Sequence, residues 1–156
     1  MAKIADAGTS AAWGWVQVAG GTDSDQGQAI AASGNNVYVA GSVANTVNSS
    51  NNVTFGSTTL AGRGNSDTFV AKLTDAGSTG SFTWALPGGG AGNDVANGVA
   101  VSGSSVYVTG YVTNNAANVN TVTFGATSLP GLGTSSFNND LFVAKLTDAG
   151  STATYA

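Results

Sequence analysis

Short runs of β-branched and aromatic residues, bounded by Gly, Asn and Ser, dominate the hydrophobic pattern of this chain. The clearest are NVYVAGSV at 36–43 and SVYVTGYV at 105–112, and runs of this kind are typical of β-strands. Both are apolar on consecutive residues, as expected of strands that are covered on both faces. No segment keeps an amphipathic 3.6-residue period over ten or more residues, so the pattern predicts an all-β fold.

Three further kinds of strand follow from the same pattern. Runs of small residues, QAIAAS at 28–33 and NGVAVS at 97–102, suit a crowded position. FVAKL occurs twice, and its alternate residues belong to opposite faces. The last kind carries tryptophan: we expect Trp13 and Trp15 to share one face of their strand, as Phe82 and Trp84 share one face of theirs.

The turns between these strands have a recognisable chemistry. TDAG places an Asp two residues before a Gly, at Asp75 and Gly77 and again at Asp148 and Gly150. An Asp side chain accepts a hydrogen bond from a nearby backbone N–H, and Gly adopts positive φ without steric cost. These segments, like SGNN and SGSS, are therefore predicted to be tight turns.

The chain repeats itself. FVAKLTDAGST at 69–79 recurs letter for letter at 142–152, and a diverged copy, AKIADAGTS, lies at 2–10. We interpret residues 1–156 as a single repeat region, with one unit at about 15–83 and a second at about 84–156. Residues 2–14 are then an overlapping strand segment from a preceding unit. An extra hairpin around TFG, at 53–60 and 122–129, is added to four main strands per unit.

The spacing GG…D…IA-x-SG-x-x-VYV-x-G…TFG…L…D-x-FVAKL-x-x-x-G…W, present in both units, resembles the bacterial β-propeller repeats called SBBP. The resemblance implies two four-stranded antiparallel blades, each with an extra hairpin, in a secreted or cell-surface protein. It brings no catalytic motif. A parallel β-solenoid and a tandem sandwich are the rival architectures, and a propeller requires Val37–Val39 and Val106–Val108 to lie in two successive sheets.

Composition narrows the possible chemistry. Charged residues make up 8% of the chain, the net charge is −4, and Cys, His and Glu are all missing. The absence of Cys and His excludes the usual ligand sets for zinc, copper and iron. It also excludes every catalytic nucleophile–base pair built on Cys or His. Four basic residues argue against nucleic acid and anionic membranes as partners. We predict no enzyme activity, no catalytic residue, no cofactor and no metal.

Two arrangements of acidic residues bear on this prediction. Thr22–Gly27 contains Asp23 and Asp25 in an Asp-x-Asp-x-Gly order reminiscent of a calcium loop. The second unit has Gly92 in place of Asp23, and no glutamate closes the loop, so a structural role is favoured.

The other arrangement pairs Asp67 with Lys72 and Asp140 with Lys145 as an acid and a base. Five residues apart on a strand, each pair points to opposite faces about 16 Å apart. We instead expect Asp67 and Asp140 to bind backbone N–H groups where their strands begin.

Repeated aromatic residues could form sugar-stacking platforms or could pack between units, and the repetition favours packing. They are Trp13, Trp15, Trp84, Tyr38, Tyr107 and Tyr111. Loops differ between the units and are rich in Asn, Ser, Thr and Gly, so they are the better place for recognition; they span 44–52, 61–66, 113–120 and 130–139.

Two stacked sheets leave an uncovered face at each side, which a longer parent or further copies must cover. The chain opens in mid-repeat and carries no signal peptide, as expected of a fragment. The expected partner is the chain itself, in a homo-oligomer, most simply a trimer or tetramer, that exchanges strands at its termini. The predicted function is a non-catalytic, self-assembling structural module. The alternative is a ligand-binding module with a glycan or protein partner at variable rim loops.

Overall fold

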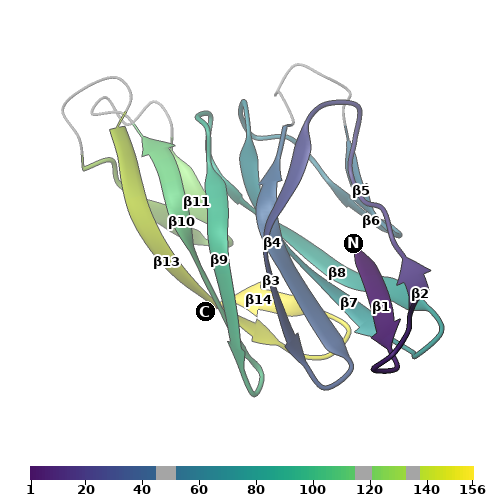
Figure 1. Ribbon diagram of the computed structural model, residues 1–156. Coiled ribbons are helices and arrows are strands. Elements are labelled where there is room, and N and C mark those ends of the chain that lie inside the picture. Colours follow the sequence, from purple (N-terminus) through teal and green to yellow (C-terminus); the bar gives the residue numbers. More distant parts are fainter. Residues whose placement is uncertain (45–51, 115–120, 133–137) are drawn as a thin grey trace.

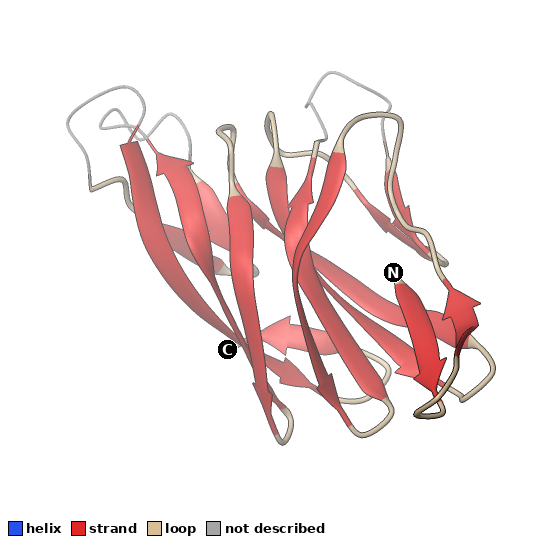
Figure 2. Ribbon diagram, viewed as in Figure 1, coloured by secondary structure: helices blue, strands red, loops and turns tan. Residues whose placement is uncertain are grey.

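The structure, a computed structural model, describes residues 1–44, 52–114, 121–132 and 138–156. Within these residues the regular structure is entirely β, and every ladder between named strands is antiparallel (Figure 2). The all-β prediction is confirmed. The part of the chain that is described contains no helix long and apolar enough to cross a membrane.

Two antiparallel sheets, each with four main strands, form the body of the molecule (Figure 1). The first sheet is β3 (Asp25–Ser33), β4 (Asn36–Val43), β7 (Asp67–Asp75) and β8 (Gly80–Gly89), side by side in that order. The second sheet is β9 (Val95–Ser102), β10 (Ser105–Asn114), β13 (Asn138–Asp148) and β14 (Ala153–Tyr155). Val37–Val39 and Val106–Val108 thus lie in different sheets, as expected from the repeat.

Three hairpins complete the fold. They are the amino-terminal hairpin, β1 (Ala2–Asp6) with β2 (Ala11–Val16), and the two TFG hairpins, β5 (Val53–Phe55) with β6 (Thr58–Leu60) and β11 (Val122–Phe124) with β12 (Thr127–Leu129). In sequence, β1 and β2 are equivalent to the second half of β7 with the first half of β8. The amino-terminal hairpin therefore repeats the pairing of β7 with β8.

The second TFG hairpin does not join its own sheet. β11 pairs with β8 through Thr123↔Gly89 and Phe124↔Gly88, which extends the first sheet to six strands. The equivalent backbone bridge in the first unit joins Thr54 to Gly20, at the end of the amino-terminal segment. The expectation that each sheet keeps its own hairpin is wrong, because the glycines after the Trp strand present the free backbone edge to which the next hairpin bonds.

The two sheets pack face to face around one core cluster. From the first sheet it contains Tyr38, Ala40, Val70 and Trp84, and from the second unit it draws β-branched and aromatic residues of β9 to β14. β9 lies beside β3 and β4 in Figure 1. A smaller cluster under the first TFG hairpin joins Phe55 and Phe69 on the opposite face of the first sheet.

The expected alternation of the Trp strands is wrong. Trp13 pairs with Ile4 and Trp15 with Lys3, so a bulge at Gly14 lies between the two tryptophans. A bulge inserts one extra residue and reverses the alternation of faces beyond it. Trp15 is consequently buried, at 8% exposure, whereas Trp13 is 69% exposed. The equivalent bulge between Phe82 and Trp84 divides that pair in the same way.

The glycine of the VYV-x-G motif has a physical explanation. A Cβ added to Gly41 would stand 1.9 Å from the backbone oxygen of Gln26, and one added to Gly110 the same distance from that of Val95. In both sheets the neighbouring strand is bulged at this point. The bulge pushes a carbonyl against the glycine, so only a residue without a side chain fits.

We expect Gly41→Ala to cost about 3 kcal/mol of unfolding free energy, because the methyl group meets backbone that must move. Gly27→Ala is the matched control on the paired strand. There the new Cβ has only Val39 Cγ1, at 3.5 Å, within 4 Å, and we expect a change within about 0.5 kcal/mol. Urea denaturation of both variants checks this, and equal effects would contradict the explanation.

Candidate functional site at the interface between the sheets

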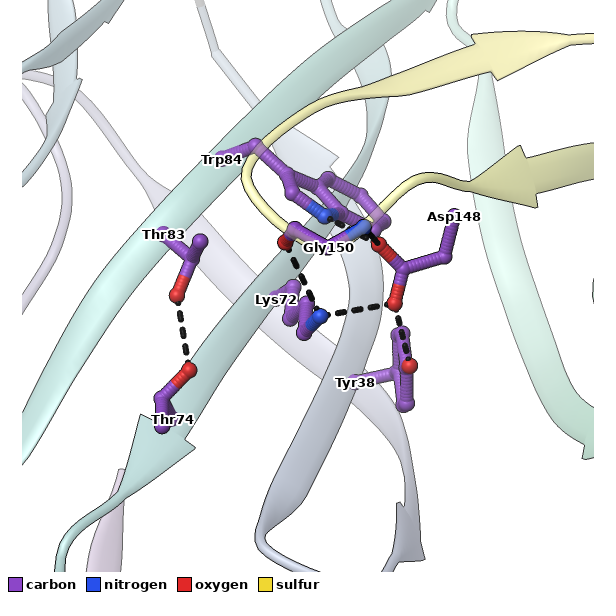
Figure 3. A network of polar contacts seen from close by, with 7 residues as sticks. All are labelled: Tyr38, Lys72, Thr74, Thr83, Trp84, Asp148 and Gly150. Atoms are coloured by element: carbon purple, nitrogen blue, oxygen red, sulfur yellow. Dashed lines mark hydrogen bonds and ion pairs between the residues drawn. The ribbon is translucent and has the colours of Figure 1, made fainter. Parts of the chain in front are cut away.

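A cluster of polar side chains joins the two sheets (Figure 3). Asp148, at the end of β13, accepts hydrogen bonds on Oδ2 from Lys72 Nζ at 2.7 Å and from Tyr38 OH at 2.6 Å. Its Oδ1 accepts the indole N–H of Trp84 at 3.1 Å. Three strands of the first sheet thus hold one carboxylate of the second.

The turn after β13 presents this carboxylate. Asp148 Oδ1 accepts the backbone N–H of Gly150 at 2.9 Å, and Gly150 has a φ of 93°. Lys72 Nζ also donates to the carbonyl oxygen of Gly150 at 3.0 Å. The TDAG turn therefore supplies two acceptors to one ammonium group, and the predicted roles of its Asp and Gly are confirmed.

The cluster is closed to solvent. The side chains of Lys72 and Asp148 are only 5% and 6% exposed. Burial raises the pKa of Asp148, but hydrogen bonds from Lys72, Tyr38 and the turn outweigh it and hold that pKa below its ordinary value. Burial and the same carboxylate raise the pKa of the Tyr38 hydroxyl. A buried ion pair of this kind costs stability when one partner is removed, so it constrains how the two sheets fit together.

The same arrangement occurs a second time. Lys3 Nζ lies 2.7 Å from Asp75 Oδ2, and Trp15 donates its indole N–H to Asp75 Oδ1 at 2.9 Å. Gly77 N–H donates to the same oxygen at 2.9 Å. Hydrogen bonds from Lys3, Trp15 and Gly77 lower the pKa of Asp75 to about 2. The contact is therefore a property of the repeat: Lys3 with Trp15, and Lys72 with Trp84, bind the turn of the unit that follows.

Sequence reasoning missed this pairing. The pair considered from the sequence was Lys72 with Asp67, which is close in the chain. The actual partner of Lys72 is Asp148, 76 residues away. The signal was present, because Lys, Asp and Trp keep the same repeat positions. Residues copied together in each unit are candidates for a contact between units.

The aromatic residues divide into two groups. Tyr38 and Trp84 pack in the core between the sheets, with ring centroids 6.0 Å apart, which agrees with packing between units. Trp13 and Tyr107 are exposed, at 69% and 41%. Tyr111 is half-buried on the same strand as Tyr107.

The remaining acidic residues bind backbone. Asp67 Oδ2 accepts Arg63 N–H at 2.8 Å and Asp140 Oδ2 accepts Leu132 N–H at 3.2 Å, which confirms their expected role. Asp25 and Asp94 likewise accept the N–H of Gly21 and Gly90, both at 2.7 Å.

The acidic side chains of the described segments lie apart or in pairs. The Thr22–Gly27 segment directs Asp25 to backbone rather than into a loop of ligands. Asp67 and Asp94 both lie beside Gly89, where a side chain would meet their carboxylates, but nowhere in the described ranges do three or more potential ligand side chains gather.

The variable loops are covered only in part. Most of 44–52, 113–120 and 130–139 lies outside the described residues. The loop at 61–66 is described, and Arg63 donates from it to Thr123 Oγ1 of β11 at 2.7 Å. This loop fastens the second TFG hairpin to the first sheet.

Two buried carboxyl groups make stability depend on pH. Burial raises the pKa of Asp67 and of Asp94 from 3.8 to about 6, and for Asp67 the nearby Asp94 adds to the effect. The folded state therefore binds these protons more tightly than the unfolded state. Their contribution to stability is complete below pH 3.8 and is lost as the pH rises through about 6. Asp75 acts oppositely, and its contribution is lost as the pH falls toward about 2.

We expect the midpoint of thermal unfolding to be higher near about pH 5 than near about pH 8. Asp67→Asn should raise the midpoint near about pH 8 and flatten this dependence, because a neutral amide replaces the buried carboxylate. Asp140→Asn, at the equivalent and less buried position, is the control and should change the pH profile less. A midpoint that rises steadily with pH in the unmodified chain would contradict the prediction.

Comparison with family models, with curated proteins and with solved structures finds no match to this chain.

Proposed function

We propose that this chain is a non-catalytic, self-assembling module of a β-propeller repeat protein of the SBBP type, exported or displayed at a cell surface. The observation that carries the proposal is the contact between the two sheets, made twice with the same residue types. An interface repeated within a chain is one that further units, or further copies, can continue.

Each face of the two-sheet body supports this proposal. β7 is buried on both faces, whereas only alternate residues of the equivalent β13 are buried. On the opposite side of the molecule, Ile30 of β3 is 62% exposed, while its equivalent in β9, Val99, packs against the core between the sheets. These apolar positions are buried where the two sheets meet and exposed on the outer faces of the molecule. Exposed apolar surface of this kind is typical of a site where another sheet binds.

An open strand edge also supports association. β8 pairs with β7 along Thr68–Asp75, but β14 pairs with β13 only along Leu146–Asp148. The rest of that β13 edge can accept the strand that begins at Trp15 of another copy, since Trp15 is equivalent to Trp84. Edges left open in this way favour pairing with another chain.

Head-to-tail contacts close into rings when the angle between sheets permits. Propellers of four to eight blades correspond to a trimer or a tetramer of a two-sheet chain. Sedimentation velocity across the micromolar range tests the proposal. We expect one discrete trimeric or tetrameric species, and a compact monomer at every concentration would refute it.

A second candidate function, recognition of a glycan or a protein, is favoured by the exposed indole of Trp13. It lies in a shallow hollow with Ile4, Ala11 and Ala12, and stacking on sugars uses exposed aromatic faces. A glycan array distinguishes the two functions: saturable binding that Trp13→Ala abolishes would support recognition, and its absence would leave assembly alone.

A further inference from the structure

The cluster at Asp75 is an incomplete copy of the cluster at Asp148. Both aspartates receive a lysine, a tryptophan and a glycine N–H, but only Asp148 also receives a tyrosine hydroxyl, on Oδ2 from Tyr38. The Asp75 side chain is 20% exposed, against 6% for Asp148. Among the residues that the structure describes, Asp75 Oδ2 accepts from Lys3 and from no tyrosine.

The missing donor lies at the other side of the molecule. Tyr107 is equivalent to Tyr38 by the repeat and is 41% exposed, whereas Tyr38 is 2% exposed. Lys145, equivalent to Lys72, is exposed two positions from Val143 on the same face of β13. Within the described segments, neither the Tyr107 hydroxyl nor the Lys145 ammonium group has a hydrogen-bond or ion-pair partner.

The apolar surroundings match in the same way. Val143 is 73% exposed, while its equivalent Val70 is 1% exposed in the core between the sheets. The exposed face of the second sheet around Tyr107 therefore matches the buried face of the first sheet around Tyr38. It also carries the positive charge of Lys145, which has no acidic partner in the described part of the chain. Asp75 supplies the negative charge. It lies on the first sheet, at the position equivalent to that of Asp148 on the face of the second sheet that packs against the first.

We propose that Tyr107 of one copy of this chain donates its hydroxyl to Asp75 Oδ2 of a second copy, in a contact that reproduces the one between Tyr38 and Asp148. The inference rests on the proposed self-assembly and identifies the surface that carries it. The exposed face of the second sheet is covered by the first sheet of another copy. This contact between copies has the same geometry as the contact between the two sheets within one chain.

This contact sets two lysines in competition. Lys3 and Lys145 are equivalent, so only one of them can occupy the lysine position beside Asp75. β13 pairs with β10 over ten residues, Ser105–Asn114, whereas β1 pairs only with β2. The amino-terminal hairpin is therefore held by fewer backbone contacts than β13. It is displaced from Asp75 when Lys145 of the neighbouring copy binds there.

Sedimentation equilibrium of four chains tests the pairing: the unmodified chain, Tyr107→Phe, Asp75→Asn and the double variant. A hydrogen bond to a charged group is lost in each single variant, so we expect association to weaken about tenfold or more. The double variant should be no weaker than the single variants, because both remove the same contact.

Tyr38→Phe is the matched control, since it removes the same hydroxyl from the inner cluster. It should lower unfolding stability and leave the association constant unchanged. If the unmodified chain associates and Tyr107→Phe and Asp75→Asn do not alter the constant, or if their effects simply add, the pairing is wrong while assembly stands. If the unmodified chain stays monomeric, both proposals fail.

Discussion

Lys72→Met is expected to destabilise the fold by about 3–5 kcal/mol, the cost of leaving a buried charge without its partner. The substitution keeps the length and most of the packing of the side chain but removes the ammonium group 2.7 Å from Asp148 Oδ2. Tyr38 and Trp84 still donate to the carboxylate, so its desolvation is only partly offset. Chemical denaturation followed by tryptophan fluorescence measures the loss.

The repeat provides a matched control for this substitution. Lys3→Met breaks the equivalent pair with Asp75, whose side chains are 33% and 20% exposed, and solvent screening should make its effect clearly smaller than that of Lys72→Met. Adding Asp148→Asn to Lys72→Met should recover part of the loss, because the remaining buried charge is removed. Equal effects of Lys3→Met and Lys72→Met would show that burial does not set the strength of this contact.

Leu146→Ala is expected to cost about 2–5 kcal/mol, through lost apolar contacts and the cavity left behind. Leu146 is fully buried in the core cluster that the two sheets share. Because that cluster draws residues from both sheets, we also expect the variant to unfold in a single transition.

Leu141→Ala, on the same strand, is the control. Leu141 is 80% exposed, and at concentrations where the chain is monomeric its truncation should change the unfolding free energy by no more than about 0.5 kcal/mol. A small effect at Leu146, or two separate transitions, would mean that the sheets fold independently and that their shared core contributes little.

Local features of this fold could be predicted from the sequence, because the residues that determine them are adjacent in the chain. The TDAG turns follow from an Asp and a Gly two positions apart, and the strand at 36–43 follows from its run of Val and Tyr. The glycine of VYV-x-G could be recognised as a repeated position. Its reason, a carbonyl of a bulged neighbouring strand, required the structure.

Features that depend on pairing between distant segments could not be predicted. The bulge at Gly14 places Trp13 and Trp15 on opposite faces of the strand. Strict alternation of side chains along a strand does not allow for such an inserted residue. The second TFG hairpin has the same sequence whether it joins its own sheet or the preceding one. Lys72 and Asp148 were individually conspicuous, but only three-dimensional placement joins them across the interface.

The two sheets pack face to face around a shared core, and we propose that further copies cover the faces left open. Electron microscopy of the purified assembly tests it most directly. We expect closed rings with an even number of sheets around a central opening, because each chain contributes two. Rods, or particles no larger than one chain, would contradict it.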